Sequence, residues 1–187
     1  MRITNLTKKF GNKVIFDNCS FEIPDKKITY IIGESGSGKT TLLRILSGLD
    51  KDYTGKFDFD NLKFAYVFQE PRLFDAISVE KNLKIVNENS NKSINEILEI
   101  VELSNETSSL PSTLSGGMKM RISIARAIYS DADIYLLDEP FSSLDVDLKS
   151  RIIPRVFNYL KGKTIIVVSH DLEESKNFAD NIINLSK

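Results

Sequence analysis

The segment Gly33–Thr40, GESGSGKT, constrains this chain more than any other feature because it fits the pattern G-x-x-x-x-G-K-[ST] in full. A β-rich run, Lys27–Ile32, precedes it, and Thr40–Leu49 follows with apolar residues at helical spacing. Glycines let the backbone wrap around a phosphate with successive N–H groups pointing at the anion, and the following helix adds the positive end of its dipole. The order of strand, loop and helix predicts the opening of a parallel α/β core that binds a nucleoside triphosphate.

The same loop supplies side chains for the phosphates and for a metal ion. Lys39 is a mobile cation for the β- and γ-phosphates, and the Thr40 hydroxyl can bind Mg²⁺. A flexible Gly/Ser loop that matches by chance is the alternative, and the strand and helix patterns on either side argue against it. The expected nucleotide-binding residues of this segment are Gly33, Ser35, Gly36, Ser37, Gly38, Lys39, Thr40 and Thr41.

Two consecutive acidic residues follow a second run that is typical of a buried strand. Asp138 and Glu139 come directly after Ile134–Leu137. An acid at the end of such a strand, close to the phosphate loop, is placed to hold Mg²⁺ through water. The next acid is placed to polarise an attacking water as a general base. A surface Asp-Glu pair in a turn is the alternative, and the phosphate loop in the same chain disfavours it.

The remaining pattern predicts a single α/β domain over residues 1–187 with two lobes. Residues 1 to about 25 alternate apolar and polar, with Val14 and Phe16 on one face, as in an antiparallel sheet with one wet side. From about Ser78 to Ser130 no strand pattern occurs, so this part forms a helical lobe. We expect a core and β subdomain at about 1–70 and 131–187, and a helical subdomain at about 71–130.

Several further elements are expected from apolar spacing. Pro154 is expected to kink or split the helix that contains it. The predicted strands are Phe64–Phe68, Ile134–Leu137, Thr164–Val168 and Ile182–Leu185, and the predicted helices are Ser93–Leu103, Lys119–Tyr129 and Asp145–Leu160.

Bulk composition narrows the class of protein. A formal net charge of −1 gives no general attraction to nucleic acid, so we expect no nucleic-acid partner. Cys19 is the only cysteine, which excludes an internal disulfide and suits a reducing compartment. No apolar run approaches the about 20 residues that cross a bilayer. These features predict a cytoplasmic protein that reaches a membrane only through another protein.

A glycine pair before the predicted helix Lys119–Tyr129 points to a family. Ser115, Gly116 and Gly117 would form a second anion site from backbone N–H groups, a hydroxyl and a helix dipole. A simple helix cap at Ser115 is the alternative. The sequence Leu114–Met118, LSGGM, resembles the LSGGQ signature of ABC ATPases, with methionine in the last place. That resemblance covers essentially the whole chain and implies the ABC-ATPase fold: a parallel-sheet core, an N-terminal antiparallel β subdomain and an α-helical subdomain.

Other residues match the family's motifs in the expected order. Phe10 matches the aromatic that stacks on adenine, and Gln69 matches the glutamine that contacts Mg²⁺ and water. Asp145 ends a stretch similar to the loop that crosses the dimer interface, and His170 matches the histidine that contacts the γ-phosphate. The resemblance implies catalytic roles for Lys39, Gln69, Glu139 and His170, nucleotide contacts from Phe10, Ser115, Gly116, Gly117 and Asp145, and metal contacts from Thr40, Gln69 and Asp138.

The resemblance also implies cofactors and partners. Two copies would stack head to tail around two ATP molecules with Mg²⁺, and an integral membrane permease subunit would hold the pair at the inner face of the membrane. Phe68–Leu73 and Ser115–Arg121 are similar to importers of the nitrate, sulfonate and taurine group, which implies an extracytoplasmic solute-binding protein, although Met120 departs from the usual glutamine. The ATPase of an exporter and a soluble, non-transport ABC ATPase remain alternatives.

Overall fold

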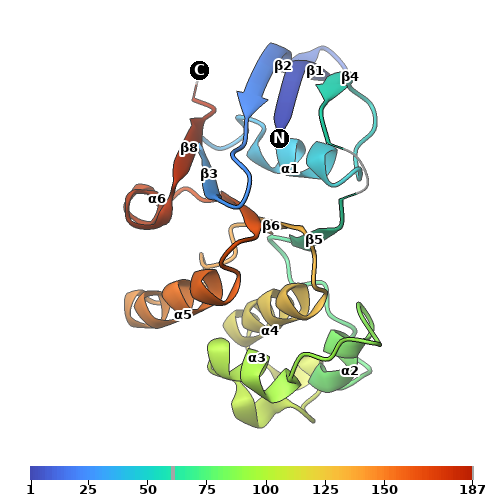
Figure 1. The fold of residues 1–187 in the computed structure, drawn as a ribbon, viewed down its shortest axis with the longest axis vertical. Coiled ribbons are helices and arrows are strands. Elements are labelled where there is room, and N and C mark those ends of the chain that lie inside the picture. The colour runs from blue at the N-terminus through green and yellow to red at the C-terminus, as the bar shows by residue number, and fades with distance from the viewer. Residues whose placement is uncertain (60–61, 187) are drawn as a thin grey trace.

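A parallel sheet forms the centre of the molecule (Figure 1). Its five strands lie in the order β5-β6-β7-β3-β8. The computed structural model of the chain describes residues 1–59 and 62–186. β6 and β7 are buried along their whole length, as their continuous apolar runs predict. The strand bounds are β3 Ile28–Ile32, β5 Phe64–Val67, β6 Ile134–Asp138, β7 Thr164–Val168 and β8 Asn181–Asn184.

A second, antiparallel sheet contains β1 (Arg2–Phe10), β2 (Lys13–Glu22) and β4 (Thr54–Phe57) in the order β2-β1-β4. The N-terminal antiparallel pair was expected, but its faces differ from simple alternation. Lys8 pairs with Phe16 whereas Lys9 pairs with Val14, so the register shifts by one residue between these two pairs. This bulge turns Val14 outward, where it is 36% exposed, and leaves Phe16 buried at 3%.

The helices of the described residues follow the predicted pattern with shifted ends. No strand lies between Ser78 and Ser130, in agreement with the expected helical lobe (Figure 1). The helix after the phosphate loop ends at Leu46 rather than Leu49, because Gly48 has a φ of 72°. Helix bounds are α1 Lys39–Leu46, α2 Val79–Lys84, α3 Ile94–Ile100, α4 Gly116–Tyr129, α5 Val146–Tyr159 and α6 Leu172–Phe178, with short 3₁₀ turns η1 at Ser104–Glu106 and η2 at Pro111–Thr113.

Pro154 does not split its helix, which was one of the two expected effects. α5 runs without interruption from Val146 to Tyr159 with Pro154 inside it. The proline lies on the exposed side, whereas Ile153 and Val156 are buried against the core. Proline removes one backbone hydrogen bond, and the burial of the opposite face keeps the helix continuous.

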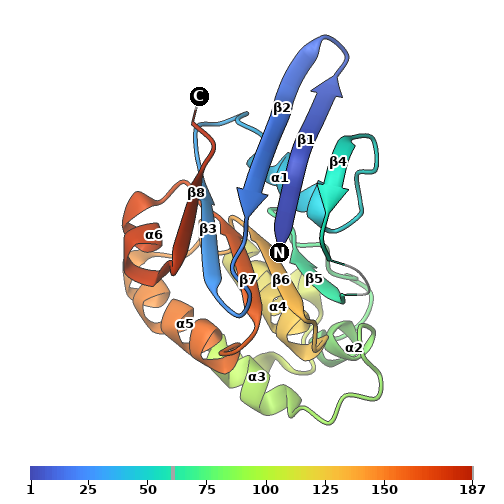
Figure 2. The same cartoon turned by 45° about the horizontal axis from the view of Figure 1, so that its top comes forward.

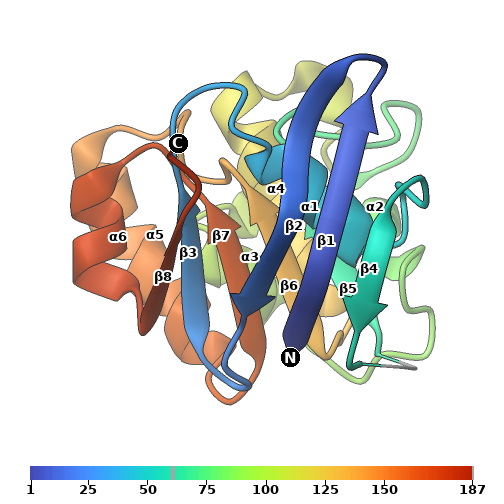
Figure 3. The ribbon, with the colours of Figure 1, turned by 90° about the horizontal axis from the view of Figure 1, so that it is seen from above.

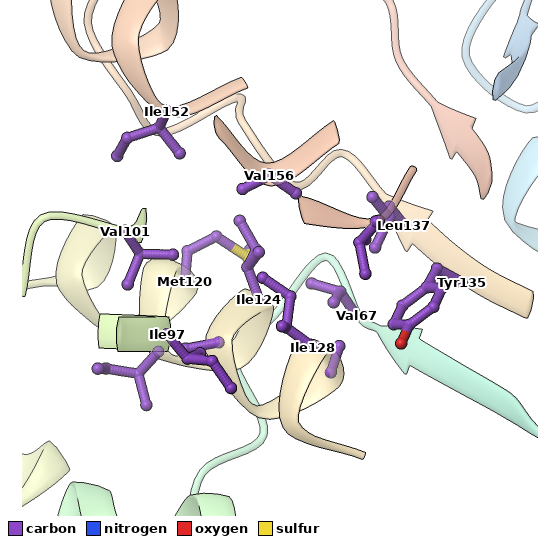
Figure 4. Close-up of a cluster of buried hydrophobic side chains, with 14 of the residues drawn as sticks. Val67, Ile97, Val101, Met120, Ile124, Ile128, Tyr135, Leu137, Ile152 and Val156 are labelled. Carbon is purple, nitrogen blue, oxygen red and sulfur yellow. The ribbon is translucent and has the colours of Figure 1, made fainter. Parts of the chain in front are cut away.

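Two hydrophobic clusters cover the two faces of the parallel sheet. One cluster joins the sheet to α3, α4 and α5, and Figure 4 shows Ile124 of α4 between Ile97 of α3 and Leu137 of β6. The other joins the opposite face to α1 and to the antiparallel sheet. α1 therefore lies between the two sheets, which Figures 2 and 3 show from two directions.

The parallel arrangement brings four loops to one edge. β3, β5, β6 and β7 all pair in parallel, so their carboxyl ends share the same edge of the sheet. In such sheets ligands bind at the carboxyl ends of the strands. Each end leads directly into a segment that the sequence analysis singled out: the phosphate loop, Gln69, the pair Asp138 and Glu139, and His170. No helix of the described residues is both long enough and apolar enough to cross a bilayer.

Candidate functional site

A cavity of about 570 Å³ opens at this edge of the sheet. It contains most of the side chains predicted for nucleotide binding and catalysis. The predicted residues that line it are Gly33, Ser35, Gly36, Gly38, Lys39, Thr40, Thr41, Gln69, Asp138, Glu139 and His170. Five residues that the sequence analysis did not select line it as well: Lys13, Ile15, Glu34, Ser142 and Val168.

The phosphate loop is held tightly against the antiparallel sheet. Gly38 has a φ of 102°, and a β-carbon there would lie 2.6 Å from the side chain of Ile15 and 2.9 Å from that of Phe16. Only glycine fits both the conformation and the space. The Lys39 ammonium donates to the carbonyl oxygens of Gly33 at 2.6 Å and Glu34 at 2.9 Å, so its charge lies inside the curve of the loop.

The residues expected to hold a metal lie together behind the loop. The Thr40 hydroxyl donates to Asp138 Oδ1 at 3.2 Å, and the Tyr66 hydroxyl donates to Asp138 Oδ2 at 3.3 Å. Burial raises the pKa of Asp138, and the two hydroxyl groups act in the opposite direction. With the Gln69 side chain in the same cavity, this set of hydroxyl, carboxylate and amide oxygens suits Mg²⁺, which prefers few protein ligands and keeps several waters.

Glu139 and His170 form the other half of the cavity. His170 Nδ1 and Glu139 Oε2 are 2.8 Å apart, with the histidine side chain 71% exposed and the glutamate side chain 13% exposed. Glu139 has a φ of 52°, in the left-handed region that residues with side chains rarely adopt. Its backbone N–H donates to the carbonyl of Val168 at 3.0 Å, which fixes the turn after β6.

Six residues predicted to contact the nucleotide do not line the cavity of their own chain. Ser115 caps α4 by accepting from the Met118 N–H at 3.3 Å, and Asp145 caps α5 by accepting from the Leu148 N–H at 2.8 Å. Ser115 and its neighbour Gly116 are exposed. The six residues absent from the cavity lining are Phe10, Ser37, Ser115, Gly116, Gly117 and Asp145.

Phe10 has a defined environment despite its exposure of 51%. The ammonium of Lys8, which is itself buried, lies 4.5 Å from the centre of the Phe10 ring. Lys8 also donates to Asp50 Oδ1 at 2.9 Å, so the strand end that carries Phe10 is fastened to the loop after α1. Phe10 does not line the cavity.

Lys13 is the positively charged lining residue that was not predicted from the sequence. It pairs with Phe10 across the hairpin turn, and its ammonium lies 3.9 Å from the position a β-carbon on Gly36 would take. Its amine therefore stands over the phosphate loop. Nothing in the residue pattern separates Lys13 from the nearby Lys8 and Lys9, because the contact depends on how the hairpin folds over the loop.

Comparison with known proteins decides the family. The ABC transporter family matches residues 16–142, which is more than half of the chain. The chain belongs to the ABC transporter family. The predicted ABC-ATPase fold is confirmed by this match together with the solved structures below. The predicted resemblance to importers of the nitrate, sulfonate and taurine group agrees, for the sulfonates, with the relatives below.

Two relatives and two solved structures show which ABC proteins this chain is similar to. An aliphatic sulfonates import ATP-binding protein of Pseudomonas syringae pv. tomato is 34% identical over 94% of this chain and 78% of its own length. One of Bacillus cereus is 35% identical over 96% and 77%. The dimeric structure of MJ0796, a bacterial ABC transporter cassette, has a TM-score of 0.84 and 28% identity, covering 99% of this chain and 94% of its own. A post-hydrolysis MJ0796 dimer bound to ADP and Pi has a TM-score of 0.82 and 28% identity, covering 98% and 93%.

Proposed function

We propose that this ABC ATPase binds ATP with Mg²⁺, dimerises head to tail, and hydrolyses the nucleotide to drive solute import through a separate membrane permease. One observation carries the chemical part. Glu139 and His170 contact each other at 2.8 Å in the cavity that the phosphate loop also lines. A general base therefore stands opposite the groups that would hold the terminal phosphate.

The predicted residues of the cavity divide into groups with different parts in hydrolysis. The backbone N–H groups of the loop and the Lys39 ammonium bind the phosphates and stabilise the charge that develops during transfer. Glu139 accepts the proton of the attacking water, and His170 orients the glutamate carboxylate and contacts the γ-phosphate. Mg²⁺ held by Thr40, Asp138 and Gln69 would neutralise charge on the phosphate oxygens.

We propose a dimer because the nucleotide site of one chain lacks the signature residues. The signature residues Ser115 and Gly116 are exposed at the start of α4 and do not line their own chain's cavity. An anion site of this kind serves a nucleotide bound to a second copy, so each ATP lies between the loop of one chain and the signature of the other. The dimeric MJ0796 structures support a dimer of this chain.

Transport and direction rest on the relatives. Proteins named as aliphatic sulfonate import subunits match this chain over more than nine tenths of its length, which favours an importer of a small solute. Such a subunit acts as one domain, with the helical lobe at about 71–130 set on the core. It lies in the cytoplasm, held to the inner face of the membrane by its permease, with an extracytoplasmic solute-binding protein on the other side. The ATPase of an exporter and a soluble ABC ATPase are the competing functions.

Replacement of Ser115 tests the shared site. We expect Ser115→Arg to bind ATP with unchanged affinity, because the residue lies outside the cavity of its own chain. Its turnover should fall about 10²-fold or more, because the arginine blocks the site that the partner's nucleotide needs. ATP affinity and steady-state turnover are measured side by side. Ser104→Arg, at an exposed position in η1, is the matched control. Normal turnover in Ser115→Arg excludes the shared site.

Partner capture tests transport. Gentle solubilisation of native membranes with a tagged chain should recover a multi-spanning permease, and a solute-binding protein with it marks an importer. Recovery of ribosomal or DNA-bound partners instead would leave the ATPase and remove the transport role.

A further inference from the structure

A tyrosine hydroxyl contacts the carboxylate of Asp138, which lines the cavity of about 570 Å³. We call this the triphosphate cavity, because the phosphate loop lines it as well. The Tyr66 hydroxyl donates to Asp138 Oδ2 at 3.3 Å, while Thr40 donates to Oδ1 at 3.2 Å. Tyr66 belongs to β5 and pairs with Leu136 of β6, two residues before Asp138 on the same face of the sheet. Both oxygens of one buried carboxylate are thus held by hydroxyl groups from different elements.

A three-layer stack joins this tyrosine to the loop that follows Gln69. The Tyr66 and Phe68 rings are stacked with centroids 4.2 Å apart and planes 17° apart. The Arg72 guanidinium carbon lies 4.1 Å from the Phe68 centroid on this stack. The side chains therefore connect an exposed loop residue to the carboxylate at the metal end of the cavity.

The tyrosine also lines a small cavity that adjoins the larger one. This cavity has a volume of about 170 Å³ and shares Thr40, Gln69 and Asp138 with the triphosphate cavity. Its lining includes two arginines, Arg44 and Arg72. The Tyr66 hydroxyl therefore lies beside a cavity lined by charged and polar side chains, and Asp138 is the acceptor that it contacts.

We propose that Tyr66 is a positioning residue for the metal site, and that the stack through Phe68 and Arg72 fixes the tyrosine in turn. The inference rests on the proposed ATPase function. A carboxylate held at both oxygens keeps one orientation, and Tyr66 holds Asp138 in the orientation in which it receives Mg²⁺ together with Thr40. Partners that orient a metal ligand typically change metal affinity by about 10- to 100-fold.

Tyr66→Phe removes the hydroxyl and keeps the stacked ring. Mn²⁺ binding is measured by electron paramagnetic resonance in the presence of a non-hydrolysable ATP analogue, and affinity for that analogue is measured separately without metal. We expect Mn²⁺ affinity to fall about 10-fold, while metal-free nucleotide affinity stays within about twofold because the hydroxyl contacts Asp138 and not the phosphate loop. Tyr135→Phe is the control. Tyr135 packs in the cluster with α4 (Figure 4), and strand alternation places Asp138, three residues on, on the opposite face of β6.

Arg72→Met tests the stack at an exposed position. We expect Mn²⁺ affinity to fall about two- to fivefold, the weight of an exposed cation–π contact. The double variant with Tyr66→Phe should lose no more than Tyr66→Phe alone, because both act through the same hydroxyl.

Three results would overturn the inference: unchanged Mn²⁺ affinity in Tyr66→Phe, an equal loss of metal-free nucleotide affinity, or an equal effect of Tyr135→Phe. If Tyr66→Phe does not fold, the loss or retention of Mn²⁺ affinity in Arg72→Met decides instead. A wild-type chain that binds no nucleotide with metal would defeat the proposed function itself, which separates the two failures.

Discussion

Glu139 holds a backbone conformation that costs a residue with a side chain on the order of 1 kcal/mol or more. Non-glycine residues in this region cluster at functional sites, where the surrounding structure holds them. Here the N–H bond to Val168 and the buried strand before it hold the turn. The strain directs the carboxylate to His170 at the edge of the cavity.

Glu139→Gln keeps the shape of the side chain and removes the base. We expect turnover to fall roughly 10²-fold or more, the usual weight of a general base, while ATP binding is retained. Steady-state ATP hydrolysis and nucleotide affinity are measured on the same preparation. Glu34→Gln, which changes another acid lining the cavity, is the control. Turnover close to wild type in Glu139→Gln would remove Glu139 from its role.

Lys13→Met tests the cation that only the folded hairpin reveals. Its ammonium stands over the phosphate loop, so its loss should weaken ATP binding about tenfold, as for a charge-assisted hydrogen bond. Lys9→Met is the matched control, since Lys9 is exposed on the same hairpin and does not line the cavity. Equal affinities in the two variants would show that Lys13 makes no phosphate contact.

Among single residues, the sequence predicted the site residues that follow a recognisable strand. It missed those that reach the site only through the pairing of strands. The loop residues, Asp138, Glu139 and His170 follow buried strands, and parallel strands bring them to one edge. Lys13 and Tyr66 join the site through a hairpin that folds over the loop and through the pairing of β5 with β6. No residue pattern along the chain contains those contacts.

At the scale of elements, burial determined which strands were predictable. β6 and β7 are buried throughout, so their apolar runs predicted them with nearly correct ends. β4 was missed because Thr54, Gly55 and Lys56 are exposed and no apolar alternation exists. In β2 the bulge changes the faces after Val14, which an alternating pattern alone does not reveal.

Pro154→Ala should stabilise α5. The substitution restores one backbone hydrogen bond at an exposed position of a continuous helix, so we expect the free energy of unfolding to rise by about 1–3 kcal/mol. Thermal or urea unfolding measures the change. Asn158→Ala, also exposed in α5, is the control and should add only about 0.5 kcal/mol. A loss of stability in Pro154→Ala would mean that the proline ring contributes packing that its exposure does not suggest.

For the whole molecule, several carboxylates stabilise the fold only while they are ionised, so acidification removes their contribution. Hydrogen bonds lower the pKa of several acids; for Asp180 the main cause is the Ile28 N–H, which donates at 2.9 Å. A lowered pKa adds stability above the unfolded value of about 4, and that stability is lost as pH falls through the folded value. Burial raises the pKa of Asp138 and Glu174, so acidification does not weaken the fold through these two. The acids with a lowered pKa are Asp50, Glu102, Asp131, Asp171 and Asp180.

The free energy of unfolding should therefore be smaller at pH 3 than at pH 6. Asp180→Asn removes one of the titrating groups, so it should lower stability at pH 6 and narrow the difference between the two pH values. Urea unfolding of both proteins at each pH measures this. Asp17→Asn, an exposed acid of β2, should leave the difference as in the wild type. An unchanged difference in Asp180→Asn would contradict the assignment.

The register of the parallel sheet has a consequence for how this molecule tolerates change. Asp138 pairs with Val168, and Leu137 pairs with Val167, so the distance between the acid and the histidine segments is fixed by apolar neighbours that touch no nucleotide. A slip of one residue would turn Asp138 to the opposite face, toward the helical lobe. The buried valines and leucines of the two strands thus determine how the reactive groups are aligned. Substitutions there should appear as losses of turnover before they appear as losses of fold.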